Sequence, residues 1–388
     1  MNLRASRILW PASIVVIASI ELLVVDPRTP AVLLGVGAIV AALLAIQLEV
    51  LRVRPRVATT TGPAAPPVPP GGGVFFRPPA APPQRTPEPP RVPASAASAN
   101  GFPAPPLFGG RPSAAHAKPW LLPARPAHAA VCADEARLGH LTVRAASVVG
   151  PGHRCEEPAV ARQDAYALGR DTAGRRLILA VADGLSSGRH SDIGASRAAT
   201  FAVDAMRRRL DQGRELAAVE VFGEIAAHLR ATAEVRRLAP EDLSTVLVVA
   251  VVNAYPDQRG VHRMWTAWIG DSAVLRHEGS AWRPIGGDTK SARDGIESNV
   301  VGASLPAEPQ LVRAEAAELP PGGMVAVMTD GVGDAIRMER SAAEFFLDRW
   351  RRPPPVAEFL THVSFQARGH QDDRTAVAVW LDAAPGGV

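Results

Sequence analysis

Aspartate residues lie at the ends of several apolar runs in the C-terminal two thirds of the chain. Asp183 ends the run LILAVADGL, and Asp330 ends MVAVMTDGV. Asp271 ends WTAWIGDSAVLR, and Asp372 comes just before the apolar part of HQDDRTAVAVWL. One Asp-Gly pair is typical of a turn, because glycine adopts positive φ and aspartate bonds its own backbone. Four such ends indicate a pattern that a single turn does not explain.

The chemistry that fits this pattern is metal-assisted hydrolysis of a phosphoester. Asp164, in RQDAYAL, is a fifth short carboxylate beside an expected strand. Carboxylates packed together raise one another's pKa unless a cation neutralises them. Oxygen ligands without histidine or cysteine favour Mg²⁺ or Mn²⁺. Two such ions can bind a phosphate and activate a bridging water molecule.

The elements that must position these carboxylates are strands and helices of one α+β domain. Apolar runs typical of strands do not alternate strictly with helical segments, which argues against a Rossmann sheet. The sequence therefore predicts antiparallel sheets with helices outside them. Strands are expected at 141–149, 177–181, 245–252, 264–269, 324–328 and 376–381. Helices are expected at 191–210, 214–230, 341–350 and 355–366.

Composition excludes some functional classes and indicates that part of the chain is not packed. The 388 residues include 37 prolines and 33 glycines, more than a fully globular chain of this size needs. The net charge of +4 does not come with a Lys/Arg block and interleaved aromatics, so nucleic-acid binding is not expected. Cys132 and Cys155 form no C-x-x-C pattern, which argues against a zinc site or a redox pair.

Two apolar stretches, 8–25 and 31–50, are separated only by DPRTP. Each is close to the roughly 20 residues that a helix needs to cross a bilayer. A helical hairpin over 1–56 is favoured over a signal peptide, because no small-residue cleavage site lies between the stretches. The positive-inside rule places both ends of the hairpin in the cytoplasm. We therefore expect a multi-pass cell-membrane protein with two spans; the basic flanks are Arg4, Arg7, Arg52, Arg54 and Arg56.

The segment 57–129 is rich in proline, alanine and glycine. Such sequence cannot bury enough apolar surface to offset the entropy of ordering, so a disordered linker is expected. It could be a plain spacer or could bind a partner through polyproline segments. The globular domain is then predicted to cover 130–388.

The motifs together resemble one family. RQDAYAL, LILAVADGLSSGRHSDIGASRAA, LSTVLVVAVV, WIGDSAVLR, AVMTDGV and DDRTAVAVWL stand in the order found in PPM (PP2C-like) metal-dependent Ser/Thr protein phosphatases. The resemblance spans about 143–381 and is closest to a bacterial, membrane-anchored member. It implies an α-β-β-α sandwich with two Mn²⁺ or Mg²⁺ ions in a cleft between two antiparallel sheets. The segment 286–309 corresponds to a variable flap beside the active site.

The resemblance also implies a role for each carboxylate. Asp183 would bridge both ions, and the backbone carbonyl of Gly184 would join one of them. Asp330 and Asp372 would hold the other ion. The remaining two are Asp164, which would support the cluster through water, and Asp271, which matches a third, weaker metal site.

Two positions depart from the family pattern. Where many members have an arginine that binds the substrate phosphate, this chain has Ala159. Arg154 or Arg162 could replace it, since the planar arginine fork matches phosphate oxygens. GPGHRCEEP resembles a bacterial version of this motif, which favours Arg154. Leu185 stands where many members have a histidine that acts as general acid, so water or one of two other histidines, His153 and His190, would protonate the leaving group.

The sequence thus predicts a phosphatase that acts on phosphoserine and phosphothreonine, anchored at the cytoplasmic face of the membrane. Its substrates would be phosphorylated proteins made by a Ser/Thr kinase. One alternative is a non-catalytic phosphopeptide-binding or scaffold protein that keeps the same fold. Another keeps the chemistry and acts on one regulator protein. The abundance of Ala, Arg, Pro and Gly is typical of a high-GC bacterial proteome.

Overall fold

The computed structural model describes residues 104–110, 115, 118–155, 158–287, 292–293, 296–297 and 303–382. The chain divides into two compact units, Met1–Glu88 and Pro89–Val388, and every described residue belongs to the second. The predicted membrane hairpin lies outside the described residues, as does the linker before residue 104. None of the helices within the described ranges combines the length and the apolar content that crossing a bilayer requires.

Two antiparallel sheets form the centre of this unit. The five-stranded sheet has the order β12-β7-β6-β5-β4. Its strands are β4 (Ala165–Arg170), β5 (Arg176–Gly184), β6 (Thr245–Asn253), β7 (His262–Ile269) and β12 (Arg313–Leu319). The six-stranded sheet has the order β2-β3-β15-β13-β8-β9. Its strands are β2 (Val131–Leu138), β3 (Leu141–Val148), β8 (Ala273–Glu278), β9 (Ala281–Gly286), β13 (Met324–Met328) and β15 (Arg374–Leu381).

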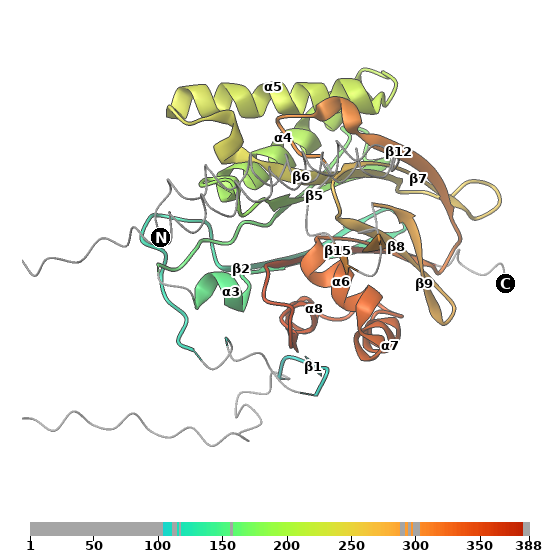
Figure 1. The fold of residues 1–388 in the computed structure, drawn as a ribbon. Helices are drawn as coiled ribbons and strands as arrows, with labels where there is room; N and C mark the ends of the chain where they lie inside the picture. Colours follow the sequence, from blue (N-terminus) through green and yellow to red (C-terminus); the bar gives the residue numbers. More distant parts are fainter. Residues whose placement is uncertain are drawn as a thin grey trace, which may run out of the picture. The chain divides into compact units, whose positions relative to one another are not determined.

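Helices cover the outer face of each sheet, as Figure 1 shows. The long pair α4 (Ser191–Asp211) and α5 (Ala218–Arg236) covers the five-stranded sheet. The six-stranded sheet is covered by α6 (Asp330–Met338), α7 (Arg340–Arg349) and α8 (Val356–Val363). The prediction of two antiparallel sheets with helices outside them is therefore confirmed.

The period-two alternation of strands explains why β5 is aliphatic throughout. Its even-numbered residues from Ile178 to Ala182 pack in one apolar cluster with α4 and α5. Its odd-numbered residues from Leu177 to Val181 pack in another, between the two sheets. A strand buried on both faces reads as a continuous apolar run rather than an alternating one. The same holds for β6, where Leu247 and Val248 fall into the two different clusters.

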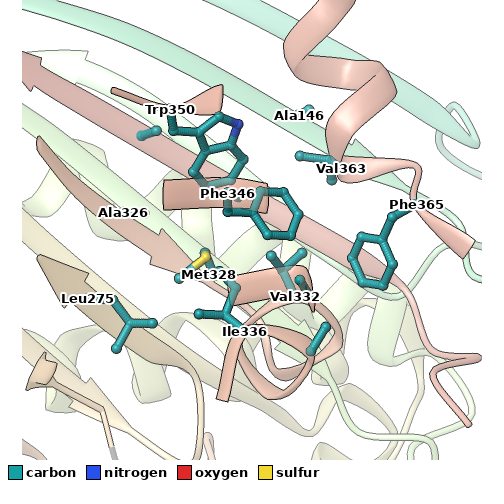
Figure 2. Close-up of a cluster of buried hydrophobic side chains, with 14 of the residues drawn as sticks. Ala146, Leu275, Ala326, Met328, Val332, Ile336, Phe346, Trp350, Val363 and Phe365 are labelled. Atoms are coloured by element: carbon teal, nitrogen blue, oxygen red, sulfur yellow. The ribbon is translucent and has the colours of Figure 1, made fainter. Parts of the chain in front are cut away.

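A third apolar cluster lies between the six-stranded sheet and α6, α7 and α8, and Figure 2 shows its aromatic members beside β13. Phe346 and Trp350, one turn apart on or just after α7, have ring centroids 4.6 Å apart. Met328 and Val332, from β13 and α6, belong to the same cluster. This packing fixes the start of α6, which follows β13 after a single residue.

Ordered contacts extend upstream of β2 into the segment that composition predicts to be a disordered linker. Phe108, in the two-residue strand β1 (Leu107–Phe108), is only 3% exposed and joins the cluster of Figure 2. β1 pairs in parallel with β14 (Gln366–Ala367). The prediction of disorder fails around Phe108, because its buried aromatic ring supplies the apolar surface that the surrounding Pro/Ala sequence lacks.

The remaining described elements are short. They are α3 (Pro151–Arg154), the 3₁₀ turns Pro240–Leu243 and Pro309–Leu311, and the two-residue strands β10 (Ala292–Arg293) and β11 (Ile296–Glu297). β10 and β11 pair with each other inside the predicted flap, of which residues 288–291, 294–295 and 298–302 lie outside the described part of the chain.

Candidate active site

The apolar layer between the sheets becomes polar at one end. On β5 the odd-numbered positions that face this layer continue from Val181 to Asp183. On β3 and β15 the same alternation leads to Ser147 and Thr375, whose hydroxyls are 2.6 Å apart and buried. Thr329, directly after β13, accepts a hydrogen bond at Oγ1 from the backbone N–H of Thr375 over 3.0 Å. Strands of both sheets therefore deliver polar groups to the same place.

Asp164 lies beside these polar groups, just before β4. It is 3% exposed, and Thr329 donates a hydrogen bond from Oγ1 to its Oδ2 over 2.8 Å. Burial raises the pKa of Asp164 well above its usual value, and the charges of Asp373 and Asp372 raise it further. The hydroxyls of Thr329 and Thr375 only partly oppose these effects.

Asp183 lies among the other predicted carboxylates. Burial raises its pKa well above the usual value, and four neighbouring negative charges add to the effect. These charges, from largest to smallest effect, belong to Asp164, Asp330, Asp372 and Asp271. The structure thus brings together all five aspartates that the sequence singled out, from segments that are far apart along the chain.

Gly184 is held in a space that no side chain could enter. A Cβ at this position would lie 2.7 Å from the carbonyl oxygen of Ser191 and 2.9 Å from that of Gln163. Such distances are shorter than real Cβ contacts, so the β5 end fits against the α4 start and the segment before Asp164 only with glycine here. Asp183 is fixed on the other side by Thr245, which donates from Oγ1 to the Asp183 carbonyl over 2.7 Å.

Asp373 is a part of the site that the sequence did not assign. It is 1% exposed and accepts hydrogen bonds from the backbone N–H groups of Gly150, over 2.6 Å, and Gln163. Its Oδ1 also lies 2.9 Å from Nδ1 of His153. One carboxylate therefore fixes α3 and the segment before Asp164 next to β15. Its adjacency to Asp372 was the one signal that could have revealed it.

His153 carries a positive charge at neutral pH. Burial alone would lower its pKa, but the hydrogen bond and charge of Asp373 and the charges of Asp372 and Asp164 outweigh burial and raise the pKa to about 9. The Nε2 atom lies 3.8 Å from Oδ1 of Asp372, whose side chain is about half exposed. His153, Asp372 and Asp373 present their ligand atoms within 4.8 Å of one another. A protonated imidazole cannot bind a metal ion, so in the metal-free protein this trio is an ion-pair network.

The donor set fits divalent cations. Arg374, 2% exposed, has its pKa lowered to about 10 by burial, although the charges of Asp373, Asp372 and Asp164 oppose this. Arg374 and His153 supply positive charge, yet the pKa values of Asp164, Asp183 and Asp372 all remain raised. Burial is the main cause of these raised pKa values and neighbouring carboxylates add to it, so a bound divalent cation would favour the charged forms; oxygen ligands of this kind suit Mn²⁺ or Mg²⁺. The residues that would hold them are Asp183, Gly184, Asp330 and Asp372, with Asp164 in support and Asp271 at a third site.

The two candidate arginines differ in their surroundings. Arg162 is 8% exposed and donates to the carbonyl oxygens of Ala129 and Asp164, over 3.0 and 2.7 Å, and to the hydroxyl of Ser147. These contacts face the protein interior and favour a positioning role. Arg154 is half-buried at the end of α3, directly after His153, with its Cζ 5.7 Å from the centre of the Trp120 ring. The assignment of Arg154 to a substrate phosphate stays a prediction.

Ala159 and the second candidate general acid, His190, also lie within the described residues. Ala159 is 8% exposed, so the place of the usual arginine is filled by a small buried side chain. His190 immediately precedes α4, and its backbone N–H donates to the Asp242 carbonyl over 2.9 Å. Among the two histidines proposed as general acids, His153 is the one with a direct contact to a cluster carboxylate.

The family model for protein phosphatase 2C matches residues 150–361, more than half of the chain. The chain belongs to the protein phosphatase 2C family. This family is metal-dependent, and the matched range contains α3, Asp164, Asp183, Asp271 and Asp330. No curated protein sequence matches the chain significantly.

Solved structures of similar fold include several bacterial phosphatases. PppA, a key regulatory component of the T6SS in Pseudomonas aeruginosa, is 19% identical, and the match covers 63% of this chain and 98% of that one, with a TM-score of 0.43. The serine/threonine phosphatase PstP/Ppp of Mycobacterium tuberculosis is 17% identical over 62% and 99% of the two chains, with a TM-score of 0.42. MsPP of Mycobacterium smegmatis, a PPM Ser-Thr phosphatase solved with cacodylate, is 16% identical over 62% and 98%, with a TM-score of 0.42.

Proposed function

We propose that this protein is a metal-dependent Ser/Thr protein phosphatase, a hydrolase that removes phosphate from phosphoserine and phosphothreonine in proteins. The observation that carries the proposal is the convergence of five aspartates from both sheets at one end of the sandwich, where burial and the charges of the other four raise the pKa of Asp183. A cluster of like charges without metal is unfavourable, and function is the usual reason for keeping one. Membership of the phosphatase family supports the same chemistry.

The side chains would divide the work between holding ions and orienting the substrate. Bound Mn²⁺ or Mg²⁺ would neutralise the carboxylates and supply an activated water molecule. The residues that would hold the ions are Asp183, the Gly184 carbonyl, Asp330 and Asp372. Rigid strand ends suit this task, because carboxylates on a sheet keep their spacing when the ion binds.

Two residues of α3 would act on the phosphate. Arg154 would orient it through two parallel N–H donors. His153, whose Nε2 lies 3.8 Å from Oδ1 of Asp372, would donate a proton to the leaving oxygen, the role that Leu185 cannot fill. Arg162 would keep Asp164 in place from behind through its bond to the Asp164 carbonyl.

One observation favours a second candidate function. Ala159 replaces the arginine that many relatives use for the phosphate, so a protein that binds phosphopeptides without cleaving them is the alternative. The presence of all five aspartates argues for catalysis, because binding alone does not require a binuclear metal centre.

The deciding test is hydrolysis of p-nitrophenyl phosphate and of a phosphothreonine peptide by the full-length protein, with Mn²⁺ or with a chelator. Asp330→Asn should lower kcat by about 100-fold or more, since even residues that only support metal ligands are worth 10–100-fold. Asp348→Asn, whose side chain is 67% exposed on α7, is the matched control and should keep full activity. A folded protein that binds the peptide and turns over neither substrate would make the binding function correct instead.

The location at the membrane is a part of the same proposal. The hairpin over 1–56 would hold the phosphatase at the cytoplasmic face, near membrane-bound kinases and their substrates, and the linker would let the domain search around its attachment point. Deleting 1–56 should move the protein from the membrane fraction to the soluble fraction and preserve turnover of p-nitrophenyl phosphate. Loss of turnover in the soluble protein would contradict a purely anchoring role.

A further inference from the structure

A cavity of about 410 Å³ lies next to the site, between the segment that precedes β2 and the residues around α3. We call residues 118–130 the strap, because they form one side of this cavity. The charged or ionisable side chains that line the cavity are all basic: Arg125, His128, Arg154 and Arg162. The remaining lining is aliphatic or proline, so no carboxylate belongs to the described lining.

Hydrogen bonds connect the strap to segments that carry or adjoin the clustered aspartates. The backbone N–H of Leu121 donates to the Arg154 carbonyl over 3.0 Å, and the ring of Trp120 lies against the Arg154 guanidinium. At the other end of the strap, Ala129 accepts a hydrogen bond from Arg162, and Ala130 accepts one from the N–H of Val149 over 2.8 Å. These bonds join the strap to α3, to the segment before Asp164 and to the end of β3. Hydrogen bonds therefore hold the side of the cavity that the strap forms against the rest of the domain.

The three arginines of the cavity differ in the ion pairs and hydrogen bonds that they form with other residues. Arg125 forms a two-bond ion pair with the buried Asp192 of α4, with Nη1 3.0 Å from Oδ2. Arg162 donates only to uncharged oxygens. Arg154 lies against an aromatic face, and its buried Nε has no hydrogen-bond partner within the described part of the chain. A buried donor without a partner is costly, and an anionic oxygen would satisfy it. The proposed contact with the reacting phosphate uses two of the five N–H donors of a guanidinium, which leaves other donors of Arg154 for a second anion.

Helix α3 connects the cavity to the clustered aspartates. His153 and Arg154 are consecutive on α3, and His153 contacts Asp372 and Asp373 of the metal cluster. Arg154 lines the cavity, as does Arg162, which donates to the carbonyl oxygen of Asp164 over 2.7 Å. Hydrolysis requires the peptide to hold its phosphorylated residue at the cluster, so residues that flank it along an extended chain come within reach of the strap.

We infer that this cavity is a subsite for a second anionic group of the phosphoprotein substrate, on a residue close in sequence to the phosphorylated one. The inference rests on the proposed function and names its substrate class: phosphoproteins with acidic or multiply phosphorylated segments. The shared chemistry is an anionic oxygen group, either a carboxylate or a second phosphate. The strap thereby acts as a specificity element, although it lies upstream of the residues that the family model matches.

The test measures kcat/KM of the full-length protein with Mn²⁺ on three sets of phosphothreonine peptides. The sets carry alanine, glutamate or a second phosphothreonine at positions from three before to three after the phosphorylated residue. We expect at least about a tenfold preference for an anionic flank, seen mainly in KM because the flank does not react. A preference confined to the second phosphate would identify phosphate as the ligand, whereas a preference for both would identify any anion.

Variants of the strap connect the preference to the cavity. Ala127 is exposed and lines the cavity, so Ala127→Glu adds a negative charge there without removing a contact. The preference should fall to about twofold or less in Ala127→Glu and persist in the neutral Ala127→Gln, which has nearly the same size. Arg154→Ala should also reduce it, whereas Arg340→Ala, whose side chain is 91% exposed on α7, should not.

Two outcomes would overturn the inference. The first is equal kcat/KM on all three peptide sets, and the second is a preference that survives both Ala127→Glu and Arg154→Ala. Failure of the proposed function is distinguishable, because it would abolish turnover of p-nitrophenyl phosphate, which has no flanking residue. In that case, fluorescence anisotropy with labelled, unphosphorylated peptides would still compare glutamate with alanine flanks. Equal binding of the two would then reject the subsite.

Discussion

Phe108 offers a quantitative test of whether the catalytic unit begins upstream of β2. Its ring is 3% exposed and contacts the rings of Phe345, Phe346 and Phe365 at centroid distances of 5.5, 5.8 and 5.3 Å. Phe→Ala changes at such buried sites cost about 3–5 kcal/mol of unfolding free energy. The segment has few other attachments, among them the bond from the N–H of Gln366 to the Pro106 carbonyl over 2.7 Å. The segment can therefore detach before the whole domain unfolds, so we expect a loss near the lower limit, about 3 kcal/mol.

The matched control is Leu107→Ala. Leu107 is the other residue of β1, and it is 46% exposed. Truncating a side chain that is already half in water should cost about 1 kcal/mol or less. The two variants change the same strand and the same backbone hydrogen bonds, so the difference between them isolates the buried ring.

The assay is urea or thermal unfolding of the full-length protein in a chelator, followed by tryptophan fluorescence. Trp350 lies in the same cluster and reports on its disruption, since it packs against Phe346. A change of 3 kcal/mol should lower Tm by at least about 6 °C in a domain of this size. Phe108→Ala and Leu107→Ala with unfolding free energies within about 0.5 kcal/mol of each other would refute the argument, and the domain would then begin at β2.

Two further predictions concern the site itself. In a chelator, the stabilisation that protonated His153 contributes should be complete below about pH 6.5 and lost as the pH rises through about 9, because the folded protein binds this proton more tightly than the unfolded chain. The effect should approach about 3 kcal/mol and be absent from His153→Gln; parallel pH profiles of the two proteins in urea unfolding would contradict it. Gly184→Ala should destabilise the fold by about 1–3 kcal/mol and lower Mn²⁺ affinity in calorimetric titration, because its Cβ would meet the Ser191 carbonyl at 2.7 Å. Gly223→Ala on α5, where a Cβ meets nothing within 4 Å, should be neutral or stabilising, and equal effects of the two changes would show that the close approach at Gly184 is unimportant.

The sequence predicts the parts of the site whose location depends on a single strand, because alternation along that strand fixes the direction of each side chain. Asp183 lies at the end of β5, a strand buried on both faces, so alternation along the strand fixes the face on which its side chain lies. The strands expected at 245–252 and 324–328 are present as β6 and β13 for the same reason. The aliphatic run itself indicates that both faces are covered.

For other elements the amino-acid sequence does not indicate the structure that forms. The Asp330-Gly331 pair is typical of a turn, but it begins α6, because Val332 and Ile336 of this segment pack into the cluster beneath the sheet. β2 lies at the edge of its sheet and has many exposed charged residues, so its sequence does not stand out from a loop. Phe108 is one aromatic residue in a proline-rich segment, and only the tertiary structure shows that its ring is buried.

The origin of the carboxylates explains why both sheets are needed for the site. Asp183 comes from the end of a strand in the five-stranded sheet, whereas Asp330 and Asp372 adjoin strands of the six-stranded sheet. The apolar side chains between the sheets hold them together, but the carboxylates at the end of this layer repel one another across it. Divalent cations bound there would join the two sheets at the point where the apolar layer stops. In the proposed metal-bound state, ion binding would therefore stabilise the packing of the two sheets, because it would offset this repulsion.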